Sequence, residues 1–233
     1  MPEPIRFRLR DLIIVMVLLT LVAAIFIVPA VLRSRMASNE TSAVAALKQL
    51  VSTESTRRGT DSDGNGFQDY WTLDISGFYG MQDQSGAMLK FIDIGFARAD
   101  ASRRVSYAGK PSPNGGPCRP VPKSGYTFRS MLSDDNAGQP TPYCVNYVRT
   151  QKNITVLRNS KGVYGYATAT NSYLFGFEAI PVKYQTTGIR VFIVCEEGVI
   201  YGVDKGDNAF VATWPGTDPT AKMNNGRFWA VVQ

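Results

Sequence analysis

The segment from Asp61 to Asp69 carries the side chains best suited to chemistry, because oxygen-bearing residues recur there at alternate positions. Four side chains and one backbone carbonyl are the candidate ligands: Asp61, Asp63, Asn65, Asp69 and, through its carbonyl oxygen, Phe67. This order is that of a calcium-binding loop, in which hard oxygen ligands converge on one cation and a glycine permits the sharp turn. Calcium is therefore the one candidate cofactor that the sequence offers.

The same segment departs from a complete calcium loop at its far end. Thr72 stands where such a loop carries a bidentate Glu, and Asp74 is the nearest substitute. The alternative interpretation is a turn, rich in Asp, Asn and Gly, that leads from a helix into the body of the protein. The sequence leaves both interpretations open.

Histidine is absent from all 233 residues, and only three are cysteine. The absence of histidine excludes Ser-His-Asp and Cys-His nucleophile systems and every histidine-based metal site. Three thiolates are too few for an all-cysteine zinc site. No pair of carboxylates is singled out by its spacing, so we expect a protein that is not an enzyme.

A long helix must position the 61–69 segment, because it ends just before that segment. Leu12 to Leu32 is uncharged over twenty-one residues, and at about 1.5 Å per residue it extends ~31 Å, enough to cross a bilayer core. Met36 to Arg58 contains no Gly or Pro, and Gly59 then supplies a stop signal. An apolar stripe recurs there at helical spacing: Ala43, Val44, Leu47, Leu50 and Val51.

Four parts of the chain follow from this pattern. They are a short leader-like segment (1–6), the transmembrane half of the helix (7–33), its amphipathic extension (34–59) and an extracytoplasmic globular domain (60–233). The fold class we expect is α+β, with the long helix packed on an antiparallel β-sheet.

Arginines flank the apolar run on both sides, where they would meet phospholipid headgroups. Arg6, Arg8 and Arg10 precede it, and Arg33 and Arg35 follow it. We expect a lipid bilayer as partner, with the N-terminus cytoplasmic and the main domain outside. The net charge of +6 is modest and the other basic residues are scattered, so we expect no nucleic-acid partner.

The globular part reads mainly as strands separated by Gly- and Pro-rich turns. We predict a second amphipathic helix at about 86–101 and polar loops at 109–125 and 133–142. The predicted strands are 126–131, 143–148, 162–168 and 174–180, then a hairpin of 189–195 with 199–203, and a last strand at 227–232. The 189–195 strand is apolar on both faces except at Arg190, so we expect it to be central and covered on each side.

The cysteines permit a disulfide outside the cytoplasm. Cys118 with Cys144 would join two loops, and Cys144 with Cys195 is the alternative pairing. Cys195 lies in the most apolar strand, so in the first case it would be a buried thiol.

The N-terminal helix resembles the type IV pilin and type II secretion pseudopilin family. That family has a Phe, an acidic residue four positions later, a long apolar helix and a Pro past its middle, which match Phe7, Asp11 and Pro29. The run Leu32–Glu40 with Ala43–Leu47 is also close to pilin sequences. The resemblance implies a structural subunit of a pilus or secretion filament in the bacterial inner membrane. It also implies like subunits, a prepilin peptidase and assembly machinery as partners.

Arg6 departs from the family, which carries Gly before the site of leader cleavage. Cleavage between Arg6 and Phe7 would create the amino terminus that pairs with the acidic residue of a neighbouring subunit, here Asp11. Without cleavage, the alternative function is a single-pass anchor that displays an extracytoplasmic binding domain. Asp11 would then lie at headgroup level beside Arg10 and complement the helix dipole.

A second, shorter resemblance lies in the strand-rich part. Gly125-Tyr-Thr-Phe-Arg129 and Val191-Phe-Ile-Val194 resemble strands of a bacterial domain of unknown role that sometimes follows pilin-like helices. This resemblance implies no activity.

Overall fold

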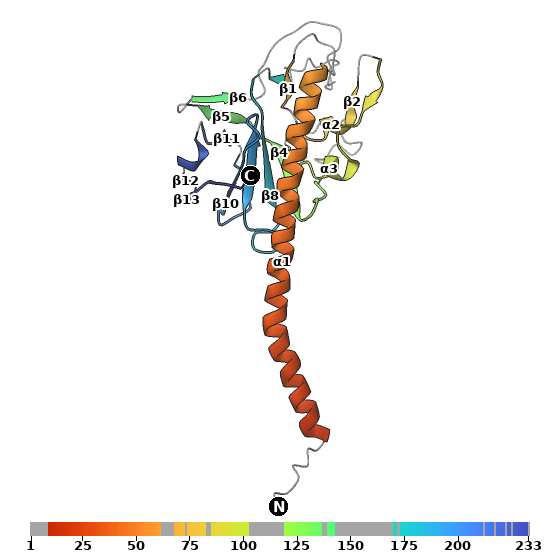
Figure 1. The fold of residues 1–233 in the computed structure, drawn as a ribbon, viewed down its shortest axis with the longest axis vertical. Helices are drawn as coiled ribbons and strands as arrows, with labels where there is room; N and C mark the ends of the chain where they lie inside the picture. Colours follow the sequence, from red (N-terminus) through yellow and green to blue (C-terminus); the bar gives the residue numbers. More distant parts are fainter. Residues whose placement is uncertain are drawn as a thin grey trace, which may run out of the picture.

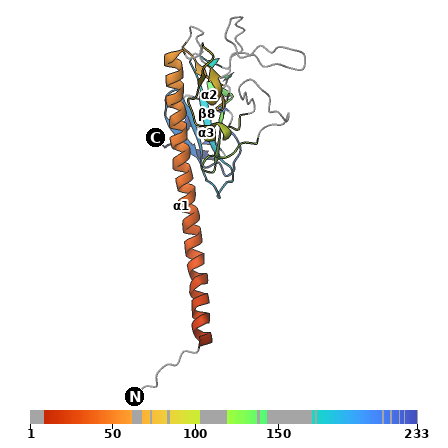
Figure 2. The same cartoon turned by 90° about the vertical axis from the view of Figure 1, so that its right-hand side faces the viewer.

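The computed structural model describes residues 9–61, 68–72, 74–82, 85–102, 119–136, 139–142, 170–171, 173–211, 213–216, 218–221, 223–224 and 226–232. One helix, α1 (Leu9–Thr60), runs the length of the molecule. A mixed α and β domain packs against one side of its C-terminal half, and its N-terminal half projects from that domain (Figures 1 and 2).

Helix α1 continues without a break through Pro29 and through the boundary between its two halves. Its end differs slightly from the expected one, since Gly59 is still helical and the left-handed backbone lies at Asp61, with φ 42°. Aspartate tolerates this conformation better than most residues, so it can end a helix as glycine does. The prediction of a single helix with an apolar first half and an amphipathic second half is confirmed.

The main sheet has five strands, all antiparallel to their neighbours, in the order β14-β10-β9-β8-β4. Its strands are β4 (Tyr126–Ser130), β8 (Gly176–Pro181), β9 (Val191–Cys195), β10 (Ile200–Val203) and β14 (Ala230–Val231). The predicted hairpin is therefore confirmed as β9 and β10, and β9 occupies the central position with every residue buried.

The second half of α1 covers one face of this sheet. Its stripe packs against β8 and β9. The cluster includes Ala43, Val44, Leu47 and Leu50 of α1 with Phe177, Ala179, Phe192 and Val194 of the sheet. Alternate residues of the same strands point to the opposite face, where Ile180, Val191, Ile193 and Cys195 pack with Trp214 and Trp229. The expectation that the central strand is covered on both sides is confirmed.

Smaller elements surround this core. They are β1 (Tyr70–Trp71) paired with β7 (Thr170–Asn171), β2 (Met81–Gln82) with β3 (Met88–Leu89), and β12 (Met223–Asn224) with β13 (Arg227–Phe228). Two short helices, α2 (Gly77–Gly80) and α3 (Ile94–Arg98), and a 3₁₀ turn, η1 (Pro219–Ala221), lie beside these strands.

The prediction of a helix over 86–101 is wrong in extent. Only Ile94–Arg98 is helical, because Asp93 caps that helix by accepting a hydrogen bond from the Phe96 N–H at 2.8 Å. Met88 is exposed and belongs to β3, which pairs with β2. The predicted stripe is nevertheless core at Ile92, Phe96 and Ala99.

The predicted loop at 133–142 is a hairpin instead. Strands β5 (Ser133–Asn136) and β6 (Gln139–Pro142) pair antiparallel, and β11 (Thr213–Trp214) joins β5 in parallel to make a three-stranded sheet. Strand β11 comes from about eighty residues later in the sequence. Pairing with it and with β6 outweighs the low strand preference of Asp, Asn and Pro.

Several predictions fall outside the described residues. These are the strands at 143–148 and 162–168 and the cysteines Cys118 and Cys144. Cys195 is a buried free thiol at the end of β9, and burial raises its pKa to about 12.

Candidate functional site on the long helix

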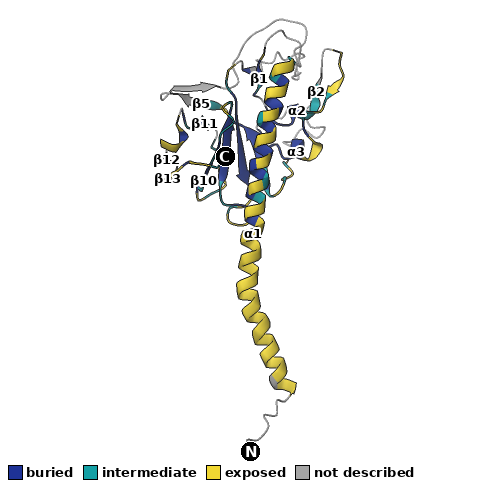
Figure 3. Ribbon diagram, in the orientation of Figure 1, coloured by how far each residue is buried: buried dark blue, intermediate teal, exposed yellow. Residues whose placement is uncertain are grey.

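The first half of α1 is an apolar surface on which no other described residue packs. Every large apolar side chain from Leu12 to Leu32 is exposed, from 43% at Val31 to 72% at Phe26 (Figure 3). Burying one such side chain is worth about 1.5–3 kcal/mol, so the whole run represents tens of kcal/mol. The segment is a candidate membrane span by length and composition.

The residues expected to act in processing and assembly lie at the start of this surface. Asp11 is in the first turns of α1. Arg6 and Phe7 lie outside the described residues. The structure therefore places Asp11 at the end of α1 farthest from the sheet domain.

The domain begins to hold the helix a few residues after the apolar run. Met36 is the first buried residue of α1. Asn39 then donates a hydrogen bond from its side-chain amide to the Thr187 carbonyl at 2.8 Å. One turn of the β8–β9 connection is thus fixed to the helix.

Glu40 makes the strongest part of this junction. One carboxylate oxygen accepts hydrogen bonds from the backbone N–H groups of Ile189 (2.9 Å) and Arg190 (3.1 Å). The other oxygen pairs with the Arg190 guanidinium at 2.8 Å. Charge-assisted bonds of this kind are roughly twice as strong as neutral ones, so Glu40 fixes the angle between helix and sheet.

Tyr126 completes the junction from β4. Its hydroxyl donates to the Arg190 carbonyl at 2.9 Å, and burial together with the nearby Glu40 charge raises its pKa. Gly188 faces this ring so closely that a Cβ there would collide with the Tyr126 hydroxyl. The contact therefore requires glycine at that position.

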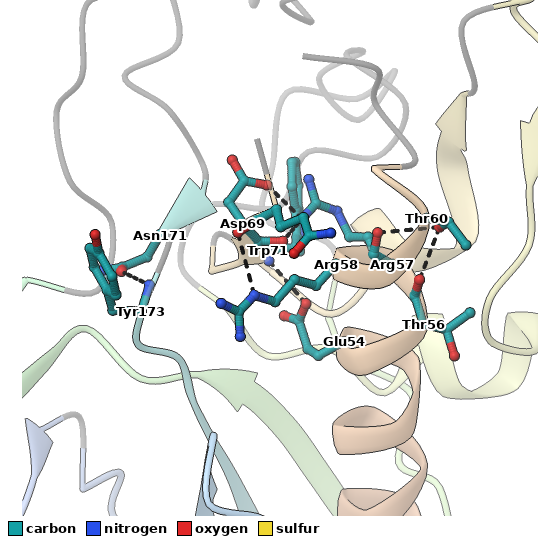
Figure 4. Close-up of polar contacts among 10 residues, drawn as sticks. Glu54, Thr56, Arg57, Arg58, Thr60, Asp69, Trp71, Asn171 and Tyr173 are labelled. Carbon is teal, nitrogen blue, oxygen red and sulfur yellow. Dashed lines mark hydrogen bonds and ion pairs between the residues drawn. The ribbon is translucent and has the colours of Figure 1, made fainter. Parts of the chain in front are cut away.

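A second polar cluster fixes the far end of α1 to β1 (Figure 4). The buried Arg57 guanidinium donates to the Asp69 carboxylate at 3.0 Å and to the Asp69 carbonyl at 2.6 Å. Arg58 donates to the Tyr70 hydroxyl at 2.7 Å and lies over the Tyr70 ring. Two consecutive arginines of the last helical turn therefore hold two consecutive residues, Asp69 just before β1 and Tyr70 at its start.

Glu54 is the buried acid of this cluster. One oxygen accepts from the Trp71 N–H at 3.0 Å, and the other has no hydrogen-bond partner among the described residues. Burial raises the pKa of Glu54 to about 8, although the Arg57 charge and the Trp71 N–H pull it down. Burial therefore favours the protonated form of Glu54 in the folded protein.

The predicted calcium ligands are only partly placed. Asp61 ends the helix and Asp69 is buried against Arg57, while Asp63, Asn65 and Phe67 lie outside the described residues. In the part of the chain that is described, no three acidic or thiol side chains gather in a way that would hold a metal ion. The sequence interpretation missed the Arg57 to Asp69 ion pair, although the opposite charges twelve residues apart were visible.

A second buried ion pair lies on the sheet face away from α1. Arg129 of β4 and Glu178 of β8 are register partners, and their side chains form an ion pair. Phe210 covers the guanidinium at 3.7 Å from its ring centre, and the Val211 N–H donates to Glu178 at 2.7 Å. This pair was also missed, because strand pairing alone brings the two residues together.

Comparison with known proteins gives one match. A family model described as a protein of unknown function (DUF2950) matches residues 117–222. That range contains both strand motifs singled out above and the Arg129 and Glu178 pair, and it excludes α1. No curated protein and no solved structure matches this chain at a significant level. Over most of its sheet domain, the chain is therefore similar to a family whose function is not known.

Proposed function

We propose that this protein is a pilin-like or pseudopilin-like structural subunit of a filament of the type IV pilus or type II secretion kind. Its N-terminal helix anchors it in the bacterial inner membrane before assembly. The supporting observation is one unbroken helix whose first half is wholly exposed and apolar and whose second half is packed into a domain.

This arrangement suits a subunit that exchanges one apolar environment for another. In the membrane, lipid surrounds residues 12–32. In a filament, the same surfaces of several subunits pack together along its axis, and the sheet domains form the outside. Because Glu40 and Arg57 hold α1 at two separate points, helix and domain move as one body during that exchange.

Asp11 supplies the specific interaction in this proposal. A carboxylate in an apolar helix is costly, about 2.5–3.5 kcal/mol at the bilayer centre, so it is retained where a cation meets it. Cleavage between Arg6 and Phe7 would provide that cation as the new amino group of a neighbouring subunit. The acid would then set the register between subunits.

Mass spectrometry of the mature protein from its native membranes tests this function. A measured mass equal to that of a chain beginning at Phe7, together with filaments that form only when Asp11 is present, supports the proposal. The informative variants are Asp11→Asn, which should abolish assembly, and Asp11→Glu, which should preserve it. A chain that still begins at Met1 or Pro2 removes this assembly mechanism.

Arg6 favours a second candidate function. An arginine where the family carries a small residue points to an unprocessed single-pass anchor that displays an extracytoplasmic binding domain. This function predicts an intact N-terminus, no filaments, and the same behaviour for wild type and Asp11→Asn.

A further inference from the structure

We propose that the end of the sheet domain nearest the exposed half of α1 docks on anionic phospholipid headgroups. The surface consists of Arg33 and Arg35 of α1 and the β8–β9 connection, residues 182–190. The inference rests on the membrane anchoring proposed above and adds a second contact between protein and lipid.

The height of this surface above the lipid follows from the helix. Glu40, which holds the connection, is eight residues beyond Leu32, or about 12 Å along the axis. The headgroup layer is roughly 5–7 Å thick on each side of a bilayer. In Figure 1 the connection after β8 extends toward the exposed half of α1, so a long side chain on it reaches the headgroups.

The connection is held rigidly in that position. Asn39 and Glu40 fix its last residues to α1. The turn itself is closed by hydrogen bonds from the N–H groups of Thr186 (3.1 Å) and Thr187 (2.9 Å) to the Lys183 carbonyl. Lys183 is exposed at this turn, so its ammonium group extends from a backbone that is held at a fixed height.

The charge of this end is positive once its ion pairs are counted. The acidic groups there are already paired: Glu40 with Arg190, Asp93 with Lys123, Asp204 with Arg227 and Asp207 with Lys205. Arg33, Arg35 and Lys183 are exposed and form no ion pair within the described residues. Three uncompensated cations close to a bilayer surface attract anionic lipid.

Exposed apolar side chains near these cations are also consistent with a lipid partner. Val182, next to Lys183, and Val121, in the neighbouring segment before β4, are both exposed. Short apolar groups next to lysine and arginine suit the boundary between headgroups and acyl chains, where the charged ends reach the phosphates.

The experiment compares lysine accessibility in the full-length protein in two kinds of nanodisc, one of phosphatidylcholine alone and one with added phosphatidylglycerol. A brief treatment with an amine-acetylating reagent is followed by peptide mass spectrometry. Lys48 is the matched control, because it is exposed on α1 about 24 Å beyond Leu32. Arg33→Gln combined with Arg35→Gln removes two of the three cations.

Docking predicts that Lys183 is acetylated several-fold more slowly in the anionic discs, with Lys48 unchanged, and that high salt or the double variant removes the difference. Equal Lys183 rates in both discs overturn the proposal while leaving the anchor intact. A third outcome is that Lys183 is acetylated slowly in both kinds of disc and that the rate falls as the protein concentration rises. That outcome overturns the proposal, because it means that a second copy of the chain, not lipid, covers Lys183. A protein that fails to enter the discs overturns the membrane anchor as well.

Discussion

Glu40 and Arg190 are 150 residues apart in the sequence, yet they form a bidentate contact where α1 enters the domain. The same carboxylate accepts the backbone N–H groups that begin the central strand β9. One side chain therefore links the membrane-facing helix to the middle of the sheet. Neither the charge pattern nor the helical stripe predicted this contact.

Replacing Glu40 should loosen that link. Glu40→Ala leaves two backbone N–H groups without their acceptor, so we expect a loss of about 1–3 kcal/mol in the free energy of unfolding. The measurement is denaturant unfolding of the full-length protein in detergent micelles. Lys48→Ala, an exposed position on the same helix, should change the free energy by less than about 0.5 kcal/mol. Equal effects of the two variants would contradict the role given to Glu40.

The same substitution, Leu to Ala, can be compared in the two halves of α1. Leu47 is fully buried, whereas Leu18 is 55% exposed. Leu47→Ala should destabilise the domain by about 2–5 kcal/mol through lost burial and a cavity, and Leu18→Ala should leave domain stability unchanged. Thermal unfolding followed by tryptophan fluorescence measures both. A large loss from Leu18→Ala would show that the first half of α1 is packed in the domain after all.

Glu54 predicts a dependence of stability on pH. Its ordinary pKa of 4.5 applies to the unfolded chain and the raised value of about 8 to the folded protein. Between these values the folded protein binds one more proton, so its free energy of unfolding falls as the pH rises from 4.5 toward 8 and levels off above that. A tenfold change in proton affinity corresponds to about 1.4 kcal/mol, so we expect a fall of more than about 1 kcal/mol.

Glu54→Gln is the control, because it mimics the protonated side chain and cannot titrate. The free energy of unfolding of wild type minus that of Glu54→Gln should decrease across the same pH range. A difference that stays constant from pH 5 to 8 would mean that Glu54 is not protonated in the folded protein.

The calcium interpretation gives a prediction of its own. Asp63→Ala removes one candidate ligand, so calcium binding measured by calorimetry should weaken at least about tenfold, equivalent to about 1.4 kcal/mol. Ser62→Ala, in the same segment but outside the ligand pattern, should bind like wild type. No heat from the wild-type protein would leave the turn as the remaining interpretation of residues 61–69.

The features that the sequence predicted well are those that depend on a short repeat of apolar residues along the chain. The apolar run from Leu12 to Leu32, the stripe through Leu47 and the hairpin around Gly198 each depend on neighbouring residues only. Their physical cause is the fixed repeat of helices and strands. The structure reproduces all three.

The features that the sequence did not predict depend on partners far along the chain. Ser133–Asn136 pairs with the nearby β6, and its other edge is covered by Thr213 and Trp214 from about eighty residues later. Glu40, Arg57 and Arg129 looked like ordinary surface charges until folding brought Arg190, Asp69 and Glu178 to them. Their burial is a tertiary property, and no spacing rule within one element indicates it.

Alkaline carbonate extraction of membranes that contain the full-length protein, followed by flotation, tests the central claim most directly. That claim is that residues 12–32 lie in lipid while the rest of α1 lies in the domain. We predict that the protein floats with the bilayer, and that Leu18→Arg with Leu21→Arg, costing about 2.5–3.5 kcal/mol per charge, releases it. Wild-type protein that remains in the soluble fraction would contradict the account.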